Sequence, residues 1–238
     1  MKKQLKITLI IAAALILAVT AFLLVWFLYA VPKREERDLR NLVEEYRAAK
    51  LARYAEENAA LVPGENYVLF LGDSLTDGCT LERYYPEYKT LNRGIGGDKT
   101  SDLVGRLKVS AYDAHPAAVV LLIGGNNLST MFDDYEEILK GLQGTLPKAK
   151  VVVVSLTAMG GRFAEKNALV CLNNVKIKLL AEKYGFLYVD VFTPLFDPEI
   201  NEIKPEYTSD GAHLTDAGYN VLTAQVKKGL AALLGKTE

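Results

Sequence analysis

Val119-Val120-Leu121-Leu122-Ile123 is apolar at every position and runs directly into Gly124-Gly125-Asn126-Asn127. A strand with one face in water alternates apolar and polar residues, whereas a strand covered on both faces does not. Val151-Val152-Val153-Val154 shows the same unbroken pattern. Both stretches therefore predict central strands of a parallel sheet with helices on each face.

Strand-length apolar stretches alternate with helix-length amphipathic stretches from Tyr67 onward. The expected strands are residues 67–71, 88–91, 117–123, 150–156 and 187–191, and the expected helices are residues 101–112, 133–142, 164–184 and 215–234. This alternation predicts one α/β domain with a five-stranded parallel sheet. Val62-Pro63-Gly64 marks its start, so we place the domain at residues 62–238.

The composition excludes several classes of protein. Lys and Arg total 28 and Asp and Glu total 29 among 238 residues, for a net charge of −1. Because no basic excess is available to neutralise a phosphate backbone, we expect no nucleic-acid partner. Cys79 and Cys171 are too few for a disulfide framework or a cysteine zinc site. Oligomeric state has no signature in the sequence.

An uncharged run of 25 residues, Ile7 to Val31, precedes the domain. A helix rises about 1.5 Å per residue, so a run of this length spans a hydrocarbon core of about 30 Å. A cleaved signal peptide is the alternative, because three lysines precede the run. Such a peptide has a shorter apolar region and ends in small residues, whereas Leu28-Tyr29-Ala30 is bulky. We interpret residues 1–31 as a cytoplasmic tail and a single-pass transmembrane anchor.

Residues 32–61 carry dense mixed charge with apolar positions at helical spacing, which predicts an amphipathic juxtamembrane helix and linker. Positive residues follow the apolar run as well as precede it, so the positive-inside rule does not orient the span. Long domains translocate largely regardless of such charge. We therefore expect the domain to lie outside the cytoplasm, at the cell membrane.

The reactive groups of an open parallel sheet lie on loops at the carboxyl ends of its strands. The first strand ends in Gly72-Asp73-Ser74-Leu75, which presents a serine Oγ at the rim of the sheet. The second ends in Gly94-Ile95-Gly96-Gly97, whose glycines let backbone N–H groups approach a developing oxyanion. The amides of Asn126 and Asn127, after the third strand, are further donors. Each loop also fits an ordinary turn or helix cap, so none decides the function alone.

A serine nucleophile needs a base, and the chain has two histidines. His115 precedes the third strand, so we expect it at the opposite edge of the sheet from Ser74. His213 lies in the loop that opens the last helix. Asp210, three residues earlier, can bind the far imidazole nitrogen and leave Nε2 free to accept a proton.

Taken in order, these loops resemble the four conserved blocks of the GDSL lipase and acylhydrolase family, also called SGNH hydrolases. The blocks here are Gly72-Asp73-Ser74-Leu75, the glycine of Asn92-Arg93-Gly94-Ile95-Gly96-Gly97, Gly124-Gly125-Asn126-Asn127 and Asp210-Gly211-Ala212-His213. The resemblance covers nearly the whole predicted domain. One position departs, because the family usually has aspartate where Asn127 stands.

The resemblance implies a flavodoxin-like three-layer α/β/α sandwich with strand order 2-1-3-4-5, and a serine esterase without metal or cofactor. Ser74 would attack the ester carbonyl, His213 would act as general base and Asp210 would orient it. The oxyanion would be bound by the N–H groups of Ser74 and Gly94 and by the side-chain amide of Asn126.

The candidate substrate-contacting side chains are Asp73, Asn127 and Tyr84. Short loops without an apolar lid favour short-chain carboxylic esters, on envelope glycans or lipids. An O-acyltransferase acting on envelope glycans and a non-catalytic membrane-anchored binding module remain the alternatives. Asn127, in place of the aspartate usual in the family, is the one sequence feature that favours the non-catalytic binding module.

Overall fold

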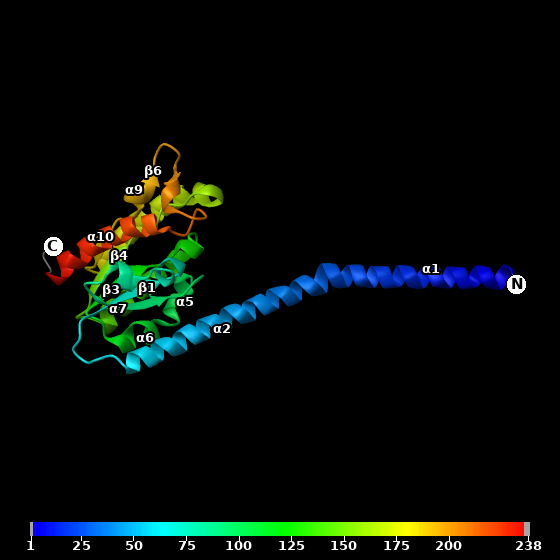
Figure 1. Ribbon diagram of the computed structural model, residues 1–238, viewed down its shortest axis with the longest axis horizontal. Helices are drawn as coiled ribbons and strands as arrows, with labels where there is room; N and C mark the ends of the chain where they lie inside the picture. Colours follow the sequence, from blue (N-terminus) through cyan, green and yellow to red (C-terminus); the bar gives the residue numbers. More distant parts are fainter. Residues whose placement is uncertain (1, 236–238) are drawn as a thin grey trace. The chain divides into compact units, whose positions relative to one another are not determined.

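The computed structural model describes residues 2–235 and divides the chain into two compact units, residues 1–50 and the remainder from Leu51 onward (Figure 1). The N-terminal unit is helical: α1 (Lys2–Val25) continues through the π-helical stretch η1 (Trp26–Ala30) into α2 (Val31–Ala59). None of the side chains of α1 is buried. This helix is long and apolar enough to cross a membrane, as a signal sequence near the N-terminus also is.

The second unit is built on a five-stranded sheet in which every neighbouring pair is parallel. The strands, in the spatial order β2-β1-β3-β4-β5, are β2 (Lys89–Gly94), β1 (Tyr67–Gly72), β3 (Ala118–Leu122), β4 (Lys150–Val154) and β5 (Leu187–Val189). All five residues of β3 are buried, which confirms a central strand covered on both faces. The predicted order and fold class are confirmed.

The helices of this unit are α3 (Ser74–Asp77), α4 (Leu81–Tyr84), α5 (Thr100–Val104), α6 (Leu107–Ser110), α7 (Tyr135–Thr145), α8 (Asn167–Lys183), α9 (Phe192–Leu195) and α10 (Asp216–Leu234). Short 3₁₀ segments are η2 (Tyr112–Ala114), η3 (Gly125–Asn127), η4 (Met131–Asp133), η5 (Gly161–Lys166) and η6 (Pro205–Tyr207), and a small antiparallel pair joins β6 (Phe196–Asp197) to β7 (Glu202–Ile203). Figure 1 shows α10 on one side of the sheet and α5, α6 and α7 on the other.

Most expected elements differ from the structure by one to three residues at their ends, and one helix differs more. The helix expected over residues 101–112 is broken into α5 and α6, because the backbone at Arg106 is not helical (φ −122°, ψ 5°) and its buried guanidinium turns to bind Asp98. The last turns of α2, from Leu51 onward, belong to the same compact unit as the sheet, and Tyr54 is buried there.

Parallel register brings the ends of three strands together. Gly72, the last residue of β1, is paired with Gly94 at the end of β2 and with Leu122 at the end of β3. The loops that follow these strands therefore meet at one edge of the sheet. A Cβ at Gly72 would lie 2.2 Å from the carbonyl oxygen of Leu122, so this close approach requires glycine.

Candidate active site

Ser74 is the first residue of α3, directly after β1. The buried Asp73 caps this short helix, and its carboxylate accepts a hydrogen bond from the N–H of Leu75 at 3.1 Å. This cap turns the chain sharply at the end of the strand and leaves Ser74 half-buried at the rim of the sheet.

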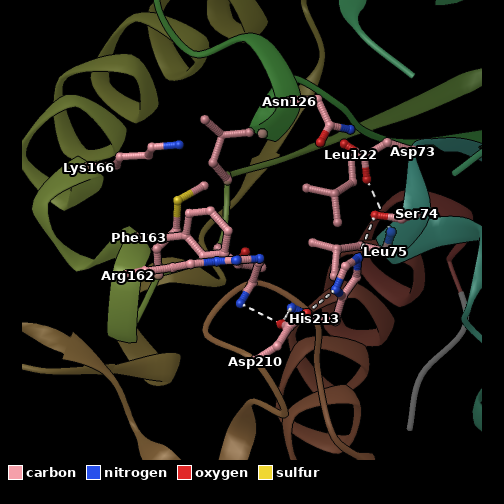
Figure 2. A pocket seen from close by; sticks show the side chains of 15 residues that line it. Asp73, Ser74, Leu75, Leu122, Asn126, Arg162, Phe163, Lys166, Asp210 and His213 are labelled. Carbon is pink, nitrogen blue, oxygen red and sulfur yellow. Dashed lines mark hydrogen bonds and ion pairs between the residues drawn. The ribbon is translucent and has the colours of Figure 1, made fainter. Parts of the chain in front are cut away.

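The structure brings Ser74, His213 and Asp210 into one chain of hydrogen bonds (Figure 2). His213 Nε2 lies 3.1 Å from Ser74 Oγ, and His213 Nδ1 lies 2.8 Å from Asp210 Oδ2. Nδ1–H therefore donates to the carboxylate, and Nε2 is left to accept the proton of the serine hydroxyl. His115, in contrast, lies beyond η2 at the start of β3, as expected.

The Asp210 carboxylate is held by its own loop. Its Oδ1 accepts hydrogen bonds from the N–H groups of Ala212 at 2.9 Å and His213 at 2.8 Å. These bonds and the bond to the imidazole keep the pKa of Asp210 well below its usual range. Gly211 makes the turn, with φ +89°, and a Cβ there would lie 2.1 Å from the carbonyl oxygen of Gly160.

The expected role of Gly94 is corrected by the structure. Gly94 is buried, and its N–H donates to the side-chain oxygen of Asn92 at 2.9 Å, so it does not face the site. A Cβ at Gly94 would lie 2.1 Å from the backbone nitrogen of Asp77. Gly94 is therefore a packing glycine between β2 and α3. An Asn two residues before a Gly is typical of a side-chain turn, so the sequence did carry this signal.

Two other glycines share that loop. The N–H of Gly96 donates to the Asp77 carboxylate at 3.1 Å. Gly97 is exposed with φ +82° and open space around its Cα, and its N–H has no acceptor among residues 2–235. The next residue, Asp98, accepts a hydrogen bond through its carbonyl oxygen from the side chain of Asn126 at 2.9 Å. Gly97 thus lies beside the residue that binds Asn126, the expected amide donor, whereas the Gly94 N–H is bound to Asn92.

Asn127 and Tyr84 also lie elsewhere than expected. Asn127 clips two loops together, because its amide donates to the hydroxyl of Thr100 at 2.9 Å and its oxygen accepts from the Thr100 N–H at 3.3 Å. Tyr84 is buried, and its hydroxyl donates to Asp216 at 3.0 Å. Neither side chain lines the cavity beside Ser74. Tyr84 therefore packs against α10 and does not face the cavity.

A cavity of about 250 Å³ opens beside Ser74 and His213. Four residues form its apolar wall, and the sequence gave no sign that they line a substrate site: Leu75, Leu122, Leu156 and Met159. Across from His213, η5 contributes Arg162, Phe163 and Lys166 (Figure 2). The Phe163 ring lies between the two cations, 4.7 Å from the Arg162 guanidinium and 4.9 Å from the Lys166 ammonium. Within residues 2–235 neither cation has a carboxylate partner.

Asp73 also lines this cavity. Burial raises the pKa of its carboxyl to about 6, and the nearby Asp98 carboxylate acts in the same direction. The hydrogen bond from Leu75 and the proximity of His213 lower the pKa by less. In the part of the chain that the structure describes, no three His, Cys, Asp or Glu side chains cluster in a way that would hold a metal ion.

The model of the GDSL-like Lipase/Acylhydrolase family matches residues 70–221. The chain belongs to this family. Among curated relatives, Platelet-activating factor acetylhydrolase IB subunit alpha2 of Rattus norvegicus is 27% identical over 184 residues, covering 71% of this chain and 78% of the relative. Accordingly, this GDSL acylhydrolase is a serine ester hydrolase.

Solved structures agree with this assignment. A protein from Streptococcus pneumonia described as a platelet activating factor has a TM-score of 0.73 and 25% identity, over 82% of this chain and 98% of that one. A GDSL-like lipase from Bacteroides thetaiotaomicron has a TM-score of 0.67 and 26% identity, over 76% of this chain and 97% of that one. Both likenesses extend over almost all of the solved chains, so the fold of this acylhydrolase is shared as a whole.

Proposed function

We propose that this acylhydrolase cleaves short-chain carboxylic esters through an acyl-enzyme, with Ser74 as nucleophile, His213 as general base and Asp210 as the orienting carboxylate. The observation that supports the proposal most directly is the hydrogen-bonded chain from Ser74 Oγ at 3.1 Å to His213 and from His213 at 2.8 Å to Asp210. An imidazole held in this tautomer can remove the hydroxyl proton while the carboxylate stabilises the imidazolium.

The reaction has two balanced halves. Ser74 Oγ bonds to the carbonyl carbon while His213 Nε2 takes its proton, and the carbonyl electron pair moves to oxygen. Collapse of this tetrahedral intermediate breaks the ester C–O bond, and the leaving alkoxide takes the proton from His213. Water then attacks the acyl-enzyme with His213 again as base, which releases the acid and restores Ser74.

Three donors are available for the oxyanion. The N–H of Ser74 has no acceptor among the described residues, and the side-chain amide of Asn126 has one hydrogen left after its bond to Asp98. The N–H of Gly97 takes the place expected for Gly94. Removing one such donor in other enzymes lowers kcat by about 10² to 10³.

The cavity favours a small acyl group. Its volume of about 250 Å³ is smaller than that of most ligand pockets, which measure roughly 300 to 1,000 Å³. The curated relative named above is an acetylhydrolase. Arg162 and Lys166 add two cations without carboxylate partners in the described chain, so esters that carry a phosphate or carboxylate are favoured over neutral ones.

The test is labelling with a fluorophosphonate together with hydrolysis of 4-nitrophenyl acetate. The wild-type chain is expected to react with the probe and to hydrolyse the ester, and Ser74→Ala is expected to do neither. The control, Ser101→Ala, changes an exposed serine on α5 and is expected to behave like the wild type. Full turnover by Ser74→Ala would remove the nucleophile assignment. Acyl transfer to an added sugar hydroxyl in excess of hydrolysis would replace the hydrolase by the O-acyltransferase.

We also propose that the apolar N-terminal segment anchors the enzyme in the cell membrane, with the catalytic unit outside the cytoplasm. The helix is long and apolar enough to span a bilayer, and its side chains lie unburied. Carbonate extraction is expected to leave the protein in the membrane pellet, and mass spectrometry to find residues 7–31 still attached. A mature N-terminus beyond residue 31 would instead establish a cleaved signal peptide.

A further inference from the structure

The last turns of α2 lie against the loop that carries the oxyanion donors. Tyr54 is the only residue of α2 that is buried, with 2% of its surface exposed. Its hydroxyl donates to the carbonyl oxygen of Gly94 at 2.6 Å. The guanidinium of Arg93 lies over its ring, 4.6 Å from the ring centre. The tyrosine thus contacts two successive residues where β2 runs into the glycine loop.

Arg93 is fixed to the same turn of α2. Its side chain is fully buried and pairs with Glu57, while a second guanidinium nitrogen donates to the side-chain oxygen of Asn58 at 3.0 Å. Glu57 is itself held by Arg53 at 2.7 Å. Two of the three guanidinium nitrogens of this desolvated side chain are thus hydrogen-bonded, and Nε has no partner among the described residues. A charge-assisted pair of this geometry makes the junction specific.

A second buried arginine carries the connection across the loop. Arg106 donates to the carbonyl oxygen of Arg93 at 3.0 Å, to the carboxylate of Asp98 at 2.7 Å and to the carbonyl oxygen of Gly72 at 2.9 Å. Both ends of the segment 93–98 are therefore held, the first by the last turns of α2 and the second by Arg106, which precedes α6. Asp98 in turn binds the amide of Asn126.

We infer that Tyr54 is a positioning residue for catalysis: by holding the Gly94 carbonyl it sets the segment that presents the Gly97 N–H and orients Asn126 toward the oxyanion. The inference rests on the proposed function. It assigns part of the active-site machinery to α2, which precedes the stretch matched by the family model, residues 70–221. Tyr54 touches neither the substrate nor the reacting atoms, and acts only through the loop.

The decisive variant is Tyr54→Phe in the full chain, which keeps the ring and removes only the hydroxyl. One neutral hydrogen bond corresponds to about a three- to tenfold change, so kcat on 4-nitrophenyl acetate is expected to fall by about that factor. KM should stay within about twofold and the pH profile should not move, because His213 and Asp210 are untouched. The matched control is Tyr67→Phe, whose hydroxyl accepts from Val62 N–H at 3.3 Å at the other end of β1.

A double-mutant cycle separates positioning from mere stability. Tyr54→Phe combined with Asn126→Ala should lower kcat by less than the product of the two single effects, because both act on the same oxyanion contacts. Tyr67→Phe with Asn126→Ala should show simple multiplication. A wild-type kcat in Tyr54→Phe, or multiplicative effects in its cycle, would overturn the inference.

Hydrogen exchange of the full chain in detergent gives a readout independent of turnover. Tyr54→Phe is expected to speed amide exchange about tenfold in peptides covering residues 94–98 and to leave residues 118–122 unchanged. Unaltered exchange at residues 94–98 would overturn the positioning role even in an inactive protein. If the wild-type chain neither labels nor hydrolyses esters, but Tyr54→Phe alters exchange as expected, the proposed function is wrong and the structural contact between Tyr54 and Gly94 is still supported.

Discussion

Ser74 and His213 are 139 positions apart in the chain, yet Ser74 Oγ and His213 Nε2 lie 3.1 Å from each other. Ser74 begins α3, just after β1, and His213 lies in the loop before α10. The loop is pinned beside the sheet by the hydrogen bond from Gly160 N–H to the Gly211 carbonyl at 2.8 Å. The contact is thus built by the backbone of three separate segments.

Asp210→Asn should lower kcat by roughly 10³ to 10⁴ with little change in KM. The amide keeps the backbone contacts but cannot stabilise an imidazolium, and it admits the wrong imidazole tautomer. Steady-state kinetics on 4-nitrophenyl acetate measure the effect. Asp216→Asn is the matched control, because Asp216 binds Arg83 and Tyr84 outside the cavity. Equal losses in the two variants would contradict the orienting role.

Asn126→Ala should lower kcat by about 10² to 10³, because the oxyanion loses a donor that acts mainly in the transition state. Asn127→Ala should change kcat far less, since the Asn127 amide is bound to Thr100 and not directed to the cavity. Comparing kcat and KM for the two neighbouring variants tests this. A larger loss of kcat in Asn127→Ala than in Asn126→Ala would instead indicate that Asn127 contacts the substrate.

Asp73→Asn should stabilise the enzyme at neutral pH. Burial raises the Asp73 pKa from 3.8 to about 6, so between these values the folded protein keeps a proton that the unfolded chain releases. The free energy of unfolding therefore falls as pH rises from about 4 to 6 and stays lowered above it. An amide, which still accepts from Leu75, removes a cost on the order of 3 kcal/mol at pH 7.

Urea unfolding at pH 7 and pH 4 measures this effect. The advantage of Asp73→Asn over the wild type should shrink as the pH is lowered, because the wild-type carboxyl then becomes protonated in both states. Asp133→Asn, which changes an exposed carboxylate on η4, should leave stability unchanged at both pH values. An advantage that grows on acidification would have the wrong sign for a buried carboxyl.

Arg162→Gln combined with Lys166→Gln should reduce the preference for anionic esters. Both side chains are exposed, and two exposed charge contacts together account for about a tenfold change in KM. That rise is expected for 4-nitrophenyl hemisuccinate, while KM for neutral 4-nitrophenyl butyrate stays within about twofold. Added salt should act like the double variant. The double variant Lys148→Gln with Lys228→Gln, two exposed lysines outside the cavity, should preserve the preference, and an equal rise for both esters would refute it.

Much of the architecture could be predicted because burial on both faces leaves an unbroken apolar pattern. Residues 119–123 and 151–154 are central strands for that reason. Ser74 follows β1 at the sheet edge where parallel topology places such loops, and His213 reaches it from the loop before α10. Tyr84 was misplaced because a tyrosine that packs and one that binds substrate look alike in sequence. The roles of Arg162 and Lys166 could not be predicted either, since a charged turn that lines a cavity looks in sequence like one that faces only solvent.

Local pattern and block order, carried by neighbouring residues, were enough to predict the parallel sheet and an ester hydrolase, and they led to the proposal of Ser74 as nucleophile and His213 as base. Tertiary structure alone decided that Gly94 is sealed by Asn92 and leaves Gly97 open, and that Tyr54 joins α2 to the same loop. The physical reason is that a backbone N–H or a tyrosine hydroxyl acquires its role from whichever acceptor the fold brings within about 3 Å. Those acceptors belong to side chains and turns whose positions depend on the packing of the whole domain.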